Sequence, residues 1–121
     1  MRRILPWMLV CLMPMSALAD DSGLDGAWTV DLSSTPGEVY TQPMVLALAA
    51  DGTVTGSFYG SAIEAGRWKQ DRGRLCASFR TTDGAGPYHT AACLDGERVS
   101  GQTWAEHRDF LFNWNATRST P

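Results

Sequence analysis

The sequence predicts an all-β fold: an eight-stranded antiparallel up-and-down meander β-barrel that follows an N-terminal signal peptide. Three observations predict this fold class. Short segments in which apolar and polar residues alternate recur at about 8–12-residue spacing, as in sandwiches and barrels. Turns that contain Gly and Asp separate these segments, and no stretch of about 11 residues keeps a helical period. With 121 residues, the chain has room for one domain and for no separate cofactor domain.

Residues 1–19 contain the three parts of a secretory signal peptide. Arg2 and Arg3 give the segment a positive start, and an almost wholly apolar run follows from Ile4 to Met15. Ala17-Leu18-Ala19 then offers a small-x-small cleavage site. A membrane-spanning helix needs about 20 apolar residues, and this run is shorter. We therefore expect a periplasmic or secreted protein.

The mature domain, residues 20–121, is acidic. Without the signal peptide it keeps 8 basic and 13 acidic residues, a net charge of −5. Binding to nucleic acid depends on clustered Lys and Arg that neutralise phosphates, so this balance argues against nucleic acid as a partner. A content of 44% hydrophobic and 19% charged residues is typical of a globular domain, not of a disordered tail or a membrane span.

Tight hairpin turns separate most of the predicted strands. Asp-Gly between alternating segments is the strongest short hairpin signal, because glycine adopts the positive φ that tight turns require. Asp51-Gly52 and Asp95-Gly96 are such pairs, whereas Ser33–Pro43 is the one long loop. The eight predicted strands are Gly26–Leu32, Met44–Ala49, Thr53–Tyr59, Ile63–Lys69, Arg74–Arg80, Tyr88–Leu94, Arg98–Ala105 and Asp109–Arg118.

Each predicted strand is expected to turn one apolar face toward a common core. The last strand shows this best, since Phe110, Phe112, Trp114 and Ala116 share one face. The first strand alternates in the same way from Trp28 onward. An open sheet of eight short strands would expose two edges, and closure into a barrel removes both.

Cys76 and Cys93 are the two cysteines of the mature domain, because Cys11 leaves with the signal peptide. In an oxidising compartment two such cysteines most simply form one disulfide. If they lie opposite each other, paired residue numbers sum to 169 and the turn centres between Gly84 and Ala85. This centre lies within the Gly- and Asp-rich turn, so we predict a cross-strand disulfide on the outer face of this hairpin.

A metal or redox pair is the alternative role for the two cysteines. A metal site requires a C-x-x-C motif or histidines at ligand spacing. His89 and His107 do not supply that spacing. The sequence therefore predicts neither a metal site nor a cofactor.

Glu106-His107-Arg108-Asp109 is the only dense cluster of titratable residues. A histidine beside carboxylates can act as a general base or a metal ligand. A charged turn is nevertheless what the boundary between the last two predicted strands requires. No catalytic or phosphate-binding motif accompanies the cluster. We favour a solvated turn, and we expect that the protein is not an enzyme.

Three short motifs resemble known small barrels. Leu24-Asp25-Gly26-Ala27-Trp28 resembles the G-x-W signature on the first strand of lipocalin-like barrels, the calycin group. The stretch 50–59 is similar to the second hairpin of bacterial avidin-like proteins. The ending 112–118 resembles the W-x-A-x-R closing strand of many small secreted bacterial barrels. The resemblance implies a lipocalin-like barrel for residues 20–121, in which Trp28 packs across a closed end.

The resemblance to avidin-like proteins does not extend to their ligand contacts. Those proteins place polar contacts two and six residues after the first tryptophan, and these positions are Val30 and Ser34 here. At most one of the two contacts is kept. The resemblance therefore implies a fold and not biotin binding.

Aromatic side chains are plentiful for so small a domain. The interior of an eight-stranded barrel is just wide enough to be filled by side chains or to hold one small ligand. Rings that bury about 150–250 Å² each can fill it, and we favour this packed interior over a pocket. A pocket would instead combine aromatic walls with a few polar groups at one mouth. The candidate ligand-binding residues are Tyr59, Trp68, Tyr88, Thr90, Gln102 and Trp104.

Two functional hypotheses follow from these features. The first is an exported, non-catalytic binding protein that holds a small, partly apolar or aromatic ligand at the open end of the barrel. The alternative is a protein-interaction module, such as an inhibitor or immunity protein of an exported hydrolase. The acidic balance and the Ser33–Pro43 loop, with Glu38 and Tyr40, favour this alternative because they could reach a basic cleft.

Overall fold

Nine antiparallel strands make up most of residues 23–120, the part of the chain that this computed structural model describes. The predicted signal peptide lies outside the described residues. A single 3-10 turn, η2 (Glu106–Arg108), is the one helical element of residues 23–120, where no helix is long and apolar enough to cross a membrane. The strands are β1 (Gly26–Asp31), β2 (Thr41–Leu48), β3 (Thr53–Phe58), β4 (Ser61–Ala62), β5 (Glu64–Asp71), β6 (Arg74–Thr82), β7 (Pro87–Asp95), β8 (Arg98–Ala105) and β9 (Phe110–Arg118).

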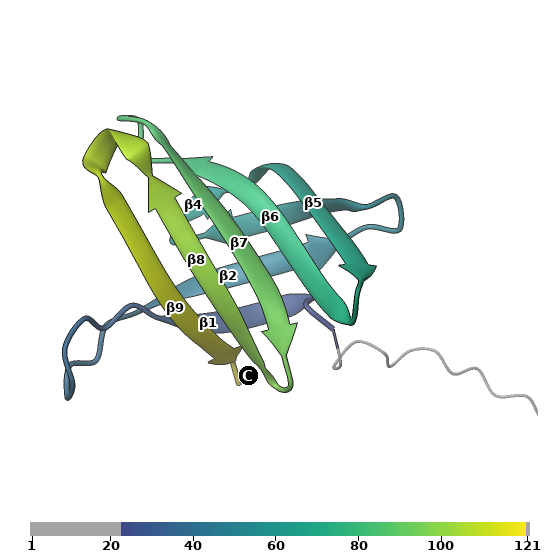
Figure 1. The fold of residues 1–121 in the computed structure, drawn as a ribbon, viewed down its shortest axis with the longest axis horizontal. Helices are drawn as coiled ribbons and strands as arrows, with labels where there is room; N and C mark the ends of the chain where they lie inside the picture. The colour runs from purple at the N-terminus through teal and green to yellow at the C-terminus, as the bar shows by residue number, and fades with distance from the viewer. Residues whose placement is uncertain (1–22, 121) are drawn as a thin grey trace, which may run out of the picture.

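The sheet closes because β1 pairs with β9 as well as with β2. The other strands pair in chain order: β2 with β3, β3 with β5, and each strand from β5 to β8 with the next. Eight strands thus surround one interior (Figure 1), and the predicted eight-stranded meander barrel is confirmed. The two-residue strand β4, which pairs with the end of β3, is an addition that periodicity did not predict.

Most strand ends differ from their predicted positions by one to three residues, and two of these differences have a structural reason. β2 begins at Thr41 rather than Met44, because its first residues pair with the end of β1. β5 begins at Glu64, and its register on β6 shifts before Arg67, where Ala65 has a φ of 54°. An irregularity of this kind bends a strand. It depends on local backbone geometry, which alternation of residue types does not encode.

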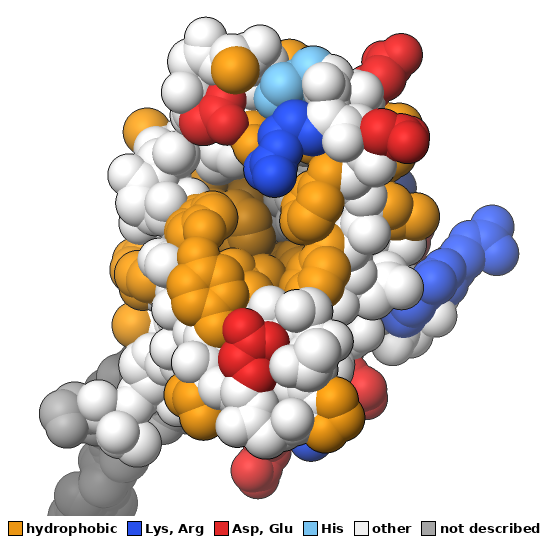
Figure 2. All heavy atoms as spheres, turned by 90° about the vertical axis from the view of Figure 1, so that its left-hand side faces the viewer, with side chains coloured by type: hydrophobic (Ala, Val, Ile, Leu, Met, Phe, Trp, Pro, Cys, Tyr) orange, Lys and Arg blue, Asp and Glu red, His pale blue; other side chains and the backbone are white. Residues whose placement is uncertain are grey.

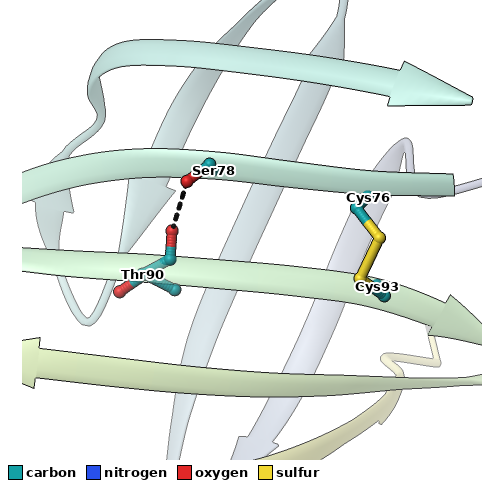
Figure 3. Close-up of a disulfide and its surroundings, with 4 residues drawn as sticks. All are labelled: Cys76, Ser78, Thr90 and Cys93. Carbon is teal, nitrogen blue, oxygen red and sulfur yellow. Dashed lines mark hydrogen bonds between the residues drawn. A yellow bond between two sulfur atoms is a disulfide. The ribbon is translucent and has the colours of Figure 1, made fainter.

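Cys76 and Cys93 lie opposite each other on β6 and β7 and form the predicted disulfide (Figure 3). The pairs that follow keep the predicted register: Ala77↔Ala92, Ser78↔Ala91, Phe79↔Thr90 and Arg80↔His89. Ala77 and Ala92 are buried in the core, and neighbouring residues of a strand point to opposite faces. The disulfide therefore lies on the outer face of the barrel, as predicted.

The barrel interior is packed at one end, which we call the closed end. Leu24, Trp28, Leu46 and Val99 are fully or almost fully buried there. The indole N–H of Trp28 donates to the carbonyl of Leu24 at 2.9 Å, so the polar atom of this buried ring is satisfied. Trp28 thus has the position that the G-x-W motif implies.

Arg118, near the end of β9, connects the last strand to the chain that enters the first. Its guanidinium carbon lies 4.1 Å from the centroid of the Trp28 ring. Its Nη1 donates to the carbonyl of Asp25 at 2.6 Å, and its Nη2 donates to the carbonyl of Gly23 at 2.8 Å. One side chain therefore covers the closed end and supports the β1–β9 closure.

We predict that the double substitution Cys76→Ala/Cys93→Ala lowers the free energy of unfolding by about 3 kcal/mol, because the disulfide restricts the conformations of the unfolded chain. The two cysteines are 17 residues apart, which gives a loop of the size for which this value holds. Urea denaturation followed by tryptophan fluorescence measures the change. Reductant should lower the stability of the wild-type protein by a similar amount and leave the variant unchanged. An unchanged unfolding midpoint in the variant would contradict the prediction.

We predict that Arg118→Met lowers the free energy of unfolding by about 2–3 kcal/mol, because two carbonyls lose a charged donor and the Trp28 ring loses a cation. Methionine keeps much of the apolar stem, so the change isolates the guanidinium. Arg74→Met is the matched control, since Arg74 is an exposed arginine at the start of β6. Its effect should stay within about 0.5 kcal/mol. Equal effects of the two substitutions would refute the role of Arg118.

Candidate ligand cavity at the open end of the barrel

The end of the barrel opposite Trp28, which we call the mouth, is hollow. The loop between β1 and β2, the turns after β3 and β6, and η2 surround it. A cavity of about 620 Å³ opens there. Figure 2 looks into it and shows a hollow lined by hydrophobic side chains, with a basic side chain and a histidine at its rim. The favoured packed interior therefore describes the closed end and is wrong for the mouth.

Aromatic rings form much of the cavity wall. Phe58 on β3 and Trp114 on β9 line it, with ring centroids 5.5 Å apart. Nearer the rim, Phe110 and Phe112 on β9 stack with centroids 5.8 Å apart and planes 10° apart. Alternation along β9 turns these rings inward, whereas Leu111 between them is 57% exposed on the outer face.

Three buried threonines place hydroxyl groups in this apolar interior: Thr81, Thr90 and Thr103. The indole N–H of Trp114 donates to the Thr103 hydroxyl at 3.0 Å, and the hydroxyls of Thr103 and Thr90 are hydrogen-bonded at 2.9 Å. This chain of bonds satisfies the polar atoms of Thr90 and Trp114. It also fixes the Trp114 ring in the cavity wall.

Thr81, near the end of β6, differs from the other two threonines. It lines the cavity and is 4% exposed, yet its hydroxyl has no hydrogen-bond partner within residues 23–120. Buried polar groups in proteins nearly always have a partner. The Thr81 hydroxyl is therefore available to a polar atom inside the cavity.

Two tyrosines meet at the rim of the cavity. The hydroxyls of Tyr40, at the end of the β1–β2 loop, and Tyr59, after β3, are hydrogen-bonded to each other. The bond to Tyr40, together with partial burial, raises the pKa of Tyr59. Tyr59 also has a φ of 60°, a conformation that residues other than glycine adopt rarely. The bond thus joins the long loop to the strand wall across one side of the mouth.

Arg108, at the end of η2, faces the other side of the mouth. Its Nη1 donates to the Tyr88 hydroxyl at 2.9 Å, and that hydroxyl donates to Asp83 Oδ2 at 2.7 Å. The guanidinium carbon lies 6.0 Å from the Tyr88 ring centroid and 5.1 Å from that of Phe110. A positive group therefore lies beside the aromatic wall, held by a hydrogen bond and by two rings.

Of the six predicted ligand-binding residues, two line the cavity: Tyr59 and Tyr88. Thr90 is buried in the interior, but its hydroxyl is taken up by Thr103 and it does not line the cavity. Trp68 lies toward the closed end, where its indole N–H donates to the Ala49 carbonyl at 2.7 Å. That ring covers the turn between β2 and β3.

Gln102, expected at the mouth, and Trp104, the other candidate ligand-binding residue on β8, do not line the cavity. On β8 the buried residues are Val99, Thr103 and Ala105, which turns Gln102 and Trp104 to the outer face. Gln102 donates to Asn113 on the neighbouring strand at 2.9 Å, and Trp104 is 38% exposed. The alternation of residue types along β8 is the sequence signal that would have placed both residues on the outer face.

Sequence reasoning missed most of the residues that line the cavity as ligand contacts, among them Phe58, Thr81, Arg108, Phe110, Phe112 and Trp114. The alternation of the last strand predicted the inward direction of both phenylalanines but not the empty space that their rings face. Arg108 was assigned to a solvated turn, and only the path of η2 brings its side chain back over the mouth. The cavity and the position of Arg108 over it depend on the closed barrel and not on the local sequence pattern.

His107, the candidate general base or metal ligand, is exposed on η2 and does not line the cavity. Its ring contacts the Tyr88 ring edge-on, with centroids 5.2 Å apart. Within residues 23–120, no group of three or more His, Cys, Asp or Glu side chains is arranged to hold a metal ion. The position of His107 is that of a side chain that packs on the outside of the rim.

Comparisons of this chain with protein-family models, with curated proteins and with solved structures found no match.

Proposed function

We propose that this protein is an exported, non-catalytic binding protein that holds one small, partly apolar ligand in the mouth of its barrel. The observation that carries the proposal is the cavity of about 620 Å³ with walls of aromatic rings. Ligand sites in proteins are typically clefts of about 300–1,000 Å³ with apolar walls and few polar groups. The cavity has the size and the composition of such a site.

The distribution of polar groups in the cavity supports a partly apolar ligand. Phe58, Phe112 and Trp114 offer ring surface that a ligand would remove from water. The Thr81 hydroxyl, without a partner in the described part of the chain, offers one hydrogen bond inside the cavity. A ligand with an apolar body and at least one polar atom satisfies both.

The disulfide and the expected signal peptide together support a periplasmic or secreted location for this binding protein. Disulfides such as Cys76–Cys93 form and persist in oxidising compartments. A lipocalin-like relationship, inferred from the G-x-W motif, agrees with the buried position of Trp28 at the closed end. Such a barrel presents its ligand site at the opposite end.

A protein-interaction module, such as an inhibitor or immunity protein of an exported hydrolase, remains the second candidate. One observation favours it: Val39, on the β1–β2 loop beside the mouth, is 87% exposed. The neighbouring Glu38 instead binds its own loop, where its Oε1 accepts hydrogen bonds from the backbone and hydroxyl groups of Ser34 and Thr35. Glu38 therefore shapes the loop more than it projects a charge, which favours the ligand-binding function.

We predict that N-phenyl-1-naphthylamine, a neutral aromatic dye that fluoresces more strongly out of water, binds the protein saturably with one dye per chain. Phe110→Ala should weaken this binding by roughly tenfold, since tenfold corresponds to about 1.4 kcal/mol and one wall ring is lost. A fluorescence titration measures both affinities.

Leu111→Ala is the matched control for this titration, because Leu111 is the next residue of β9 and lies on the outer face. It should leave the dye affinity unchanged. Circular dichroism of both variants checks that the barrel is folded. Absence of saturable dye binding to the folded wild-type protein would overturn the proposed function, as would equal effects of the two substitutions.

A further inference from the structure

The charge at the mouth narrows the chemical class of the ligand. Among the residues of 23–120 that line the cavity, Arg108 is the only lysine or arginine. It forms no ion pair with an acidic side chain in the described part of the chain. A guanidinium has five N–H donors, and within residues 23–120 the one acceptor of Arg108 is the Tyr88 hydroxyl. Its remaining donors are available at the rim.

The two acidic residues that line the cavity already have donors of their own. Glu38 accepts its hydrogen bonds within the β1–β2 loop, and the backbone N–H groups of Ser34 and Thr35 lower its pKa. Asp83 accepts from the backbone N–H of Ala85 at 2.9 Å as well as from Tyr88. Glu38 is thus bound within its own loop. Asp83 is bound by Ala85 and Tyr88, and the hydrogen bond from Arg108 to Tyr88 together with the nearby charge of Asp83 raises the pKa of Arg108. Arg108 still forms no direct ion pair with Asp83 in the described part of the chain.

The guanidinium of Arg108 is also held in place. Tyr88 fixes one of its nitrogens, and the rings of Tyr88 and Phe110 lie 6.0 Å and 5.1 Å from its carbon. A planar guanidinium can bind a carboxylate through two parallel hydrogen bonds. Binding costs less conformational entropy when the position of the guanidinium is already restricted. Arg108 therefore has the chemistry and the position of an anion-binding group beside an apolar cavity.

We propose that the ligand is an anion: a small molecule with an aromatic or otherwise apolar body and one carboxylate or similar oxyanion group. The oxyanion binds Arg108 at the rim, and the apolar body lies between Phe58, Phe112 and Trp114. Tyr88 acts as a positioning residue that orients the guanidinium. This inference rests on the proposed function, because it assigns a charge to the ligand of the same cavity.

The test compares 2-naphthoate with 2-naphthamide, which share an apolar body and differ in the charge of the terminal group. Isothermal titration calorimetry at low salt measures both affinities. The wild-type protein should bind naphthoate at least about tenfold more tightly than naphthamide, as expected of a charge-assisted pair beside an apolar surface. Added salt should weaken naphthoate binding and leave naphthamide binding almost unchanged.

Substitution of Arg108 tests whether this residue causes the preference for naphthoate over naphthamide. Arg108→Gln should weaken naphthoate binding by about tenfold and change naphthamide binding by less than about twofold. Arg108→Lys keeps the charge without the planar guanidinium, so it should retain part of the preference for naphthoate over naphthamide. Arg98→Gln, which removes the same charge from an exposed site at the closed end, should change neither affinity by more than about twofold.

The outcomes separate this inference from the function on which it rests. Equal affinities for naphthoate and naphthamide overturn the anion inference, and so does a preference that Arg108→Gln leaves intact. If N-phenyl-1-naphthylamine binds while neither naphthoate nor naphthamide does, the anion inference is likewise overturned and the binding function stands. If N-phenyl-1-naphthylamine itself does not bind, the proposed function falls.

Discussion

Closure between the first and the last strand is the constraint on which this structure depends. β1 pairs with β9, and Arg118 of β9 lies over the Trp28 ring and binds the carbonyls of Gly23 and Asp25. Without this seam the sheet would have two exposed edges and no enclosed interior. With it, eight strands surround a space whose width is set by strand number. The packed closed end and the hollow mouth are two outcomes of the same closure.

The two ends differ because of where the large and small side chains lie. At the closed end, aliphatic residues and Trp28 meet across the axis and exclude space. Toward the mouth, the rings of Phe58, Phe112 and Trp114 lie along the walls. Gly101 makes room for one of them, since a Cβ at that position would lie 2.2 Å from an atom of the Trp114 ring. The cavity therefore results from a specific distribution of residue sizes, and its polar groups are few and individually placed.

Much of the fold could be predicted from the sequence because its signals are local. Alternation located all eight ring strands, and the Cys76–Cys93 register followed from one turn position. The candidate site was predicted less well. Tyr59 and Tyr88 line the cavity, but Gln102 and Trp104 lie outside it, and Arg108 was assigned to solvent. Whether inward rings fill a barrel or line it depends on how eight strands fit together, and the reach of a turn residue over the mouth depends on the closed shape. Neither property is encoded by any one segment.

The central claim, that the mouth and not the closed end takes up a small aromatic molecule, is tested most directly by the indole N–H signals in a ¹H–¹⁵N NMR titration with N-phenyl-1-naphthylamine. The Trp114 indole lies in the cavity wall, whereas the Trp28 and Trp68 indoles donate to carbonyls at the closed end. The account predicts that the Trp114 signal shifts saturably while the Trp28 and Trp68 signals stay in place. Shifts of equal size at all three indoles, or a Trp114 signal that does not move, would contradict it.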